Sequence, residues 1–135
     1  MPGWGTGNFE NEDAQSFLGR LNSLGVEDLR QMLAHAADQD YLEAPEGGAV
    51  VAAAEVVAAL VAAANDETSS PATPRQILDW ISKNEAGAPP DLVEAARRAV
   101  EKVRSNSELK DLWLEAEGLN EWSAALRELK ERLSC

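Results

Sequence analysis

Apolar side chains recur every three or four residues along most of the chain, which is the spacing of one face of an α-helix. A first group with this spacing consists of Ala14, Phe17, Leu18 and Leu21, and a second lies between Val26 and Asp38. No run of β-branched residues alternates strictly with polar ones, as a half-buried strand would require. The pattern therefore predicts an all-α protein.

The stretch from Gly48 to Ala64 consists almost entirely of alanine and valine, and Glu55 is its single charged residue. A helix that is apolar nearly all round is normally surrounded by other helices, and small side chains let those neighbours approach closely. A membrane span needs about twenty strongly apolar residues, whereas this run is shorter and rich in weakly hydrophobic alanine. We expect it to be the central helix of a bundle and expect no membrane insertion.

Helix-start and helix-stop signals divide the rest of the chain. Asn11 is a suitable N-cap for the first helix, and Thr73 opens a capping box that is followed by proline. Ser105 and Glu108 have the spacing of a second capping box, Gly118 is a suitable stop, and Asn120 can cap the last helix. These signals predict a compact single domain over residues 1–135, built from about seven helices around the Ala/Val-rich one.

The formal net charge of −12 is unevenly distributed along the chain. Residues 1–70 contain twelve acids and two arginines, whereas residues 71–135 contain twelve acids and ten bases. Such a field repels phosphate backbones and attracts a basic protein or a cation. The composition therefore argues against nucleic-acid binding and leaves two interpretations open, which are solubility alone and association with a basic protein partner.

Two features bear on the expected location of the protein. The single cysteine, Cys135, is the last residue, so it can close no disulfide within this sequence. The opening Met-Pro-Gly-Trp lacks the basic and apolar regions of a secretory signal. We therefore expect a cytoplasmic protein that does not associate with a membrane.

Glu55 is the most distinctive candidate site residue. On an ideal helix it shares a stripe of small residues with Gly48, Ala52, Ala59 and Ala62. In one interpretation this stripe is solvated, or is half buried with Glu55 paired to an arginine or a tryptophan indole. In the other, the small neighbours leave room for a pocket in which Glu55, with further carboxylates from Asp13 and Glu43, serves acid/base or metal chemistry.

The acids around the second predicted turn do not form a recognisable metal motif. They are Asp38, Asp40, Glu43 and Glu46, and in a helix-loop-helix calcium site the required glycine would fall on Glu43 and the closing glutamate on Ala49. His35 is the one histidine and Cys135 the one cysteine of the chain, too few to make a zinc site of histidine and cysteine ligands. One interpretation is a solvated turn, and the other is loose binding of a divalent cation by these four carboxylates. The sequence indicates no defined metal site and no cofactor.

The opening of the chain, Trp4-Gly5-Thr6-Gly7-Asn8-Phe9-Glu10-Asn11-Glu12-Asp13-Ala14, resembles that of a small bacterial family, domain of unknown function 4259. Tyr41-Leu42-Glu43, the alanine-rich run around Glu55, and Ser107-Glu108-Leu109 followed by Trp113 are also similar to that family. The resemblance spans nearly the whole chain, and it implies no activity.

The two glycines of this opening do not make a phosphate loop, because three acids follow them and no strand precedes them. They are better interpreted as permitting tight turns that fold Trp4 back over the bundle. A tryptophan that precedes the first helix is also a candidate anchor for a partner protein.

Two functions are compatible with these patterns. The first is a non-catalytic interaction or regulatory module, such as a toxin-neutralising protein, whose acidic N-terminal half binds a basic partner. The second is an enzyme or divalent-cation-binding protein that uses Asp13, Glu43 and Glu55. The first demands less of the sequence, because no motif places a nucleophile, and the sequence indicates no oligomeric state.

Overall fold

The computed structural model describes residues 12–64, 75–83 and 89–133, and it is helical with no strand in these ranges. The elements are α1 (Glu12–Arg20), a 3-10 turn η1 (Leu21–Ser23), α2 (Val26–Ala37), α3 (Ala44–Ala64), α4 (Arg75–Lys83), α5 (Pro90–Ser105), α6 (Glu108–Glu115) and α7 (Leu119–Leu133). The prediction of an all-α bundle of about seven helices is therefore confirmed.

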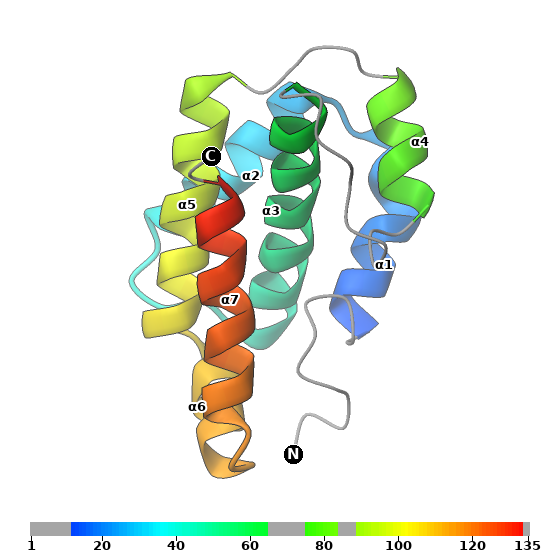
Figure 1. Cartoon of the computed structure of the whole chain (residues 1–135). Coiled ribbons are helices and arrows are strands. Elements are labelled where there is room, and N and C mark those ends of the chain that lie inside the picture. Colours follow the sequence, from blue (N-terminus) through cyan, green and yellow to red (C-terminus); the bar gives the residue numbers. More distant parts are fainter. Residues whose placement is uncertain (1–11, 65–74, 84–88, 134–135) are drawn as a thin grey trace.

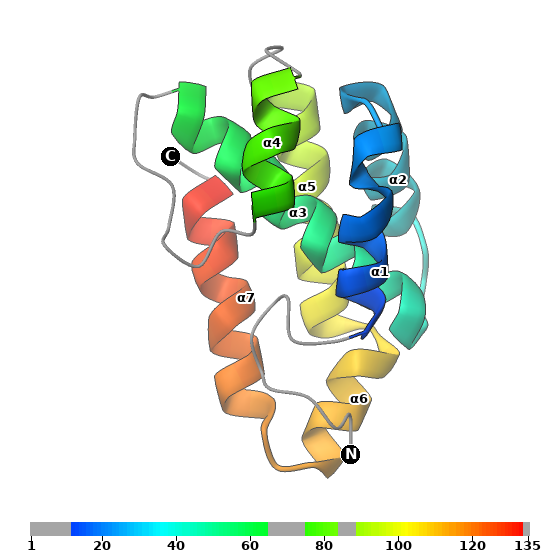
Figure 2. The same ribbon diagram turned by 90° about the vertical axis from the view of Figure 1, so that its right-hand side faces the viewer.

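Helix α3 is the centre of the bundle. The six other α-helices that the structure describes all contact it. In Figure 1, α5 and α7 lie on one side of α3, α1 and α4 lie on the other, and α2 lies behind it; Figure 2 shows the same arrangement from the side of α1 and α4. Every residue from Gly47 to Val61 is buried. The prediction that the Ala/Val-rich segment forms a central helix is confirmed.

By length and composition alone, α3 is apolar enough over Glu46–Ala63 to cross a membrane, and it is the one such helix in the described part of the chain. The bundle buries 83% of that window. Its apolar character is thus accounted for by packing against other helices, which is the usual environment of a core helix in a globular protein.

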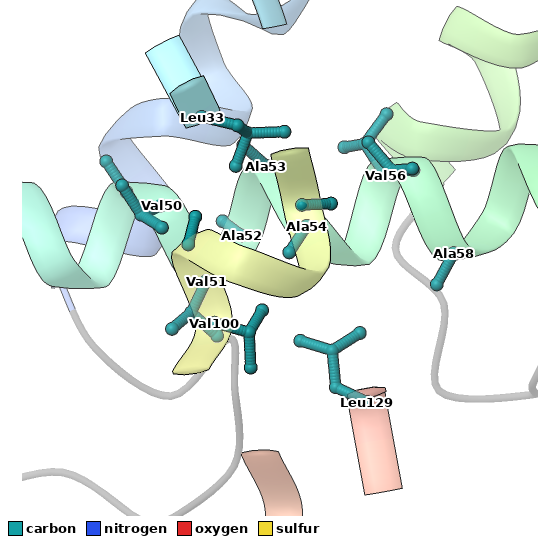
Figure 3. Packing of buried hydrophobic residues seen from close by; sticks show 14 of the residues in the cluster. Leu33, Val50, Val51, Ala52, Ala53, Ala54, Val56, Ala58, Val100 and Leu129 are labelled. Atoms are coloured by element: carbon teal, nitrogen blue, oxygen red, sulfur yellow. The ribbon is translucent and has the colours of Figure 1, made fainter. Parts of the chain in front are cut away.

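The core around α3 is built from side chains of unequal size. Figure 3 shows Val50, Val51 and Val56 of α3 together with Leu33 of α2, Val100 of α5 and Leu129 of α7. Between the valines, Ala52, Ala53 and Ala54 are fully buried. Because alanine adds so little width to a helix, the neighbouring helices can pack close to the axis of α3 on several sides at once.

The bounds of two helices differ from the sequence-based expectation. Helix α3 begins at Ala44 and not at Gly48, because the chain already turns helically through Pro45, a residue that the first turn of a helix tolerates. Helix α7 begins at Leu119, so Asn120 lies inside its first turn and is not the cap. The predicted caps Asn11 and Thr73 lie outside the described residues.

The capping box that we expected at Ser105 and Glu108 is wrong. Ser107 is the N-cap of α6, and its Oγ accepts a hydrogen bond from the backbone N–H of Lys110 at 3.1 Å. The Oγ of Ser105 instead donates to the carbonyl of Glu101 at 2.7 Å, within α5. Of the two serines, only Ser107 has the extended backbone angles that an N-cap requires, and it caps α6.

Helix α6 ends three residues before the predicted stop at Gly118, in a Schellman motif whose left-handed residue is Glu117 and not the glycine. The N–H of Gly118 donates to the carbonyl of Trp113 at 3.1 Å, and the N–H of Glu117 donates to that of Leu114 at 3.4 Å. Glu117 has a φ of 62°, the left-handed conformation that this motif requires. The turn ends α6 and directs α7 back along α3.

A short backbone pairing joins the α2–α3 connection to the α5–α6 connection. The N–H of Leu42 donates to the carbonyl of Asn106 at 3.1 Å, and the N–H of Glu108 donates to the carbonyl of Leu42 at 2.7 Å. A Cβ added at Gly47 would lie 3.1 Å from Leu109 Cδ1, so α3 and α6 approach closely here. This junction places Tyr41 beside α6.

Candidate functional site

Glu55 is held in a buried ion pair between α3 and α7. The residue is 8% exposed, and Arg132 donates from Nη1 to Oε1 at 2.7 Å and from Nη2 to Oε2 at 2.9 Å. These hydrogen bonds raise the pKa of the Arg132 guanidinium above its ordinary value, against the opposing effect of burial. The Nε of Arg132 also lies 3.2 Å from Glu128 Oε1. Both oxygens of Glu55 are thus engaged by one guanidinium, as in a structural ion pair.

This arrangement answers one of the questions that the sequence left open. Within the stripe of small residues around Glu55, Gly48, Ala52 and Ala59 are buried and Ala62 is partly exposed, so most of the stripe is covered by the bundle. Glu55 is paired with an arginine, which was one of the structural alternatives. Its partner is 77 residues away along the chain.

The structure does not bring Glu43 and Glu55 together. Glu43 is exposed and lies directly before α3. Twelve residues separate it from Glu55, so at a rise of about 1.5 Å per residue the two backbones are about 18 Å apart along the helix axis. Asp13 is the second residue of α1 and is half-buried. In the described part of the chain, no three histidine, cysteine, aspartate or glutamate side chains are grouped as a metal ion would require.

Two other residues singled out from the sequence complete this account. Trp4, the candidate partner anchor, lies outside the described residues. Asp38, the first acid of the predicted solvated turn, is exposed, and its Oδ1 lies 3.6 Å from Nη2 of Arg98 in α5. A surface pair of this kind contributes little to stability.

A different cluster stands out on the surface, at the junction of the α2–α3 connection with α6. Tyr41 is 49% exposed, and its hydroxyl donates to Oδ2 of Asp111 at 2.7 Å. Leu114, one turn further along α6, is 58% exposed. Glu43 and Glu108 lie close enough to Tyr41 to affect its ionisation. We refer to Tyr41, Glu43, Glu108, Asp111 and Leu114 as the Tyr41 patch.

The electrostatics of the Tyr41 patch can be measured directly, because the chain contains one tyrosine. The hydrogen bond to Asp111, followed by partial desolvation and the negative charges of Asp111, Glu108 and Glu43, raises the pKa of Tyr41 to about 12. The phenol therefore stays protonated at neutral pH, and it cannot serve there as a base.

We expect a spectrophotometric titration of tyrosinate absorbance to give a pKa for Tyr41 well above the ordinary value of about 10. Since the folded state favours the protonated phenol, this interaction stabilises the fold fully below a pH of about 10 and is lost as the pH rises through the folded pKa of about 12. The Asp111→Ala variant removes the acceptor of this hydrogen bond, which is the largest cause, so the pKa of Tyr41 should be lower in that variant. An unchanged pKa in that variant would contradict the geometry of the Tyr41 patch.

Sequence reasoning did not single out Tyr41, Asp111 or Leu114 as site residues. A signal for Leu114 was present, because the apolar face of that helix runs through Leu109, Leu112, Trp113 and Ala116 and omits it. An aromatic residue within an acidic turn is a weaker signal of the same kind. The contact between Tyr41 and Asp111 joins residues 70 positions apart, and no local pattern indicates it.

The family model for Domain of unknown function (DUF4259) matches residues 3–125 of the chain. No curated protein and no solved structure matches the chain. The matched region includes every residue of the Tyr41 patch, whereas Arg132, the partner of Glu55, lies beyond it.

Proposed function

We propose a function for this chain, which belongs to the family of domain of unknown function 4259, from the properties of its surface. It is a non-catalytic interaction module that binds a basic protein partner through the Tyr41 patch. The observation that carries this proposal is the half-exposed Tyr41, whose hydroxyl is fixed by Asp111 among further carboxylates.

Charge supports a basic partner. The Tyr41 patch contains three carboxylates and no base, on a chain whose formal net charge is −12. Lys110, the nearest base in the sequence of α6, donates its ammonium to the carbonyl of Ser105 at 3.3 Å. An acidic surface of this kind accelerates encounter with a basic protein and disfavours nucleic acids.

The apolar members of the Tyr41 patch supply contact area. Tyrosine is enriched among the residues that dominate binding energy, because its ring is large and rigid and its hydroxyl tolerates water. The hydrogen bond to Asp111 fixes Tyr41 before binding, so little further side-chain entropy is lost on association. Leu114 adds an exposed apolar side chain on the same face of α6 as Asp111.

We do not propose the alternative of an enzyme or divalent-cation-binding protein that uses Asp13, Glu43 and Glu55. Ligands of one metal ion lie within about 2.6 Å of it, so those carboxylates would have to converge. The separation of Glu43 from Glu55 along α3 and the engagement of Glu55 by Arg132 give that alternative no support.

The test compares the wild-type chain with Asp111→Asn/Leu114→Ser and with a matched control, Asp79→Asn/Leu78→Ser, which makes the same two changes at exposed positions of α4. A partner is recovered from native lysate at low salt, identified and purified. Its affinity for the three chains is then measured. We expect the first variant to bind at least about fivefold more weakly and the control to bind like the wild type.

Binding to the wild type should also weaken as salt is added, because the contact is between opposite charges. Two results would contradict the proposal. One is the recovery of no salt-sensitive partner, and the other is an equal affinity of the partner for the wild type and both variants.

A further inference from the structure

We infer that the Tyr41 patch selects arginine over lysine, so that its partner presents an arginine-bearing segment. This inference rests on the proposed function, and it names the chemistry that the surface recognises. Three features of the Tyr41 patch lead to it, which are the ring of Tyr41, the acceptor oxygens of Asp111 and Glu43, and the exposed Leu114.

The side chain of Tyr41 is accessible to a cation. Its hydroxyl is held by Asp111 at 2.7 Å, and about half of the residue remains exposed. A phenol that donates to a carboxylate passes electron density to its ring, which strengthens the attraction of the ring face for a cation. Guanidinium is planar and weakly hydrated, so it stacks on such a face at a smaller desolvation cost than an ammonium group.

Two carboxylates of the Tyr41 patch, those of Asp111 and Glu43, can accept further hydrogen bonds. Asp111 uses Oδ2 for Tyr41, and its Oδ1 accepts no hydrogen bond from a residue that the structure describes. The carboxylate of Glu43 likewise has no ion-pair partner among those residues. A guanidinium carries five N–H donors in one plane and can donate to two carboxylates while it lies over the ring. An ammonium group acts as a point charge and is more strongly hydrated.

Leu114 should contribute to the affinity for a basic segment without affecting the preference for arginine over lysine. Arginine and lysine both carry an aliphatic stem, and either stem can lie on the exposed leucine while the charged group reaches Asp111 one turn away. Selectivity therefore belongs to Tyr41 with its carboxylates, and Leu114 contributes equally to both ligands. Variants of Tyr41 and of Leu114 should therefore differ in their effect on the preference for arginine.

The experiment uses two peptides of equal length and charge, one carrying arginines and the other lysines in an otherwise identical sequence, and measures their dissociation constants by fluorescence anisotropy. The chains compared are the wild type, Tyr41→Leu, Leu114→Ser and the control Leu78→Ser. For the wild type we expect the arginine peptide to bind about three- to fivefold more tightly. Tyr41→Leu should abolish this advantage, Leu114→Ser should weaken both peptides alike, and Leu78→Ser should change neither.

Each other outcome overturns a definite statement. Equal affinities of the two peptides for the wild type, or an arginine advantage that survives in Tyr41→Leu, would overturn the selectivity. If Leu114→Ser still weakens both peptides relative to Leu78→Ser, the proposed binding surface stands without it. If neither Tyr41→Leu nor Leu114→Ser weakens either peptide relative to Leu78→Ser, both the selectivity and the proposed function fail.

Discussion

Replacement of Arg132 by leucine is expected to lower the free energy of unfolding by about 2 to 3 kcal/mol, as measured by denaturant unfolding. Breaking a fully buried ion pair costs about 3 to 5 kcal/mol, because a charge is left in the interior without its partner. Arg132 is 36% exposed, and solvent therefore screens part of this cost. Glu55 would lose both of the hydrogen bonds that the guanidinium donates to it.

Two further variants separate the pair from the general effect of changing α7. Arg127 is exposed on the same helix and forms no ion pair with a described residue, so Arg127→Leu should change the stability by less than about 0.5 kcal/mol. The double variant Glu55→Leu/Arg132→Leu removes both charges, and it should lie within about 1 kcal/mol of the wild type. Equal stabilities of Arg132→Leu and Arg127→Leu would show that the ion pair does not hold α7 on α3.

The Ala53→Leu variant is expected to lower the free energy of unfolding by about 2 to 3 kcal/mol, because added methylene groups in a close-packed core force side chains and helices apart. Ala53 is fully buried in the middle of α3, and the helices around it are positioned by the small width of that helix. Thermal and denaturant unfolding both measure the loss.

The same substitution near the exposed end of α3 is the control. Ala63 is exposed, so Ala63→Leu should change the stability by no more than about 0.5 kcal/mol. If Ala53→Leu were tolerated equally well, the space around the middle of α3 would be larger than the packing of the core implies, and small side chains would not be required there.

Helix capping shows where local patterns stop being sufficient. Ser105 and Glu108 have the spacing of a capping box, yet Ser107 caps α6. Ser107 has the extended backbone angles that a cap needs, and the residues on either side of it pair with Leu42. Leu42 belongs to the connection between α2 and α3, so a contact remote in sequence decides which serine ends the turn. The sequence pattern itself fits either residue.

The candidate site was less predictable than the fold. For Glu55 the sequence supplied the correct alternatives, because a carboxylate on an apolar helix must be solvated or paired when it is buried. It could not supply the partner, Arg132, which lies 77 residues away. For the Tyr41 patch, the sequence did not indicate that the residues lie close together. Their proximity depends on the backbone pairing of Leu42 with the start of α6.

The sequence by itself determined the helices, the central place of the Ala/Val-rich segment and the acidic character of the chain. Helical periodicity and turn residues act over a few positions, and hydrophobic content decides which helix is enclosed, so these properties can be derived from local composition. Only the tertiary structure decided that Glu55 meets Arg132 and that Tyr41 meets Asp111. Such contacts depend on the relative placement of helices far apart in the chain, which the packing of the whole bundle fixes.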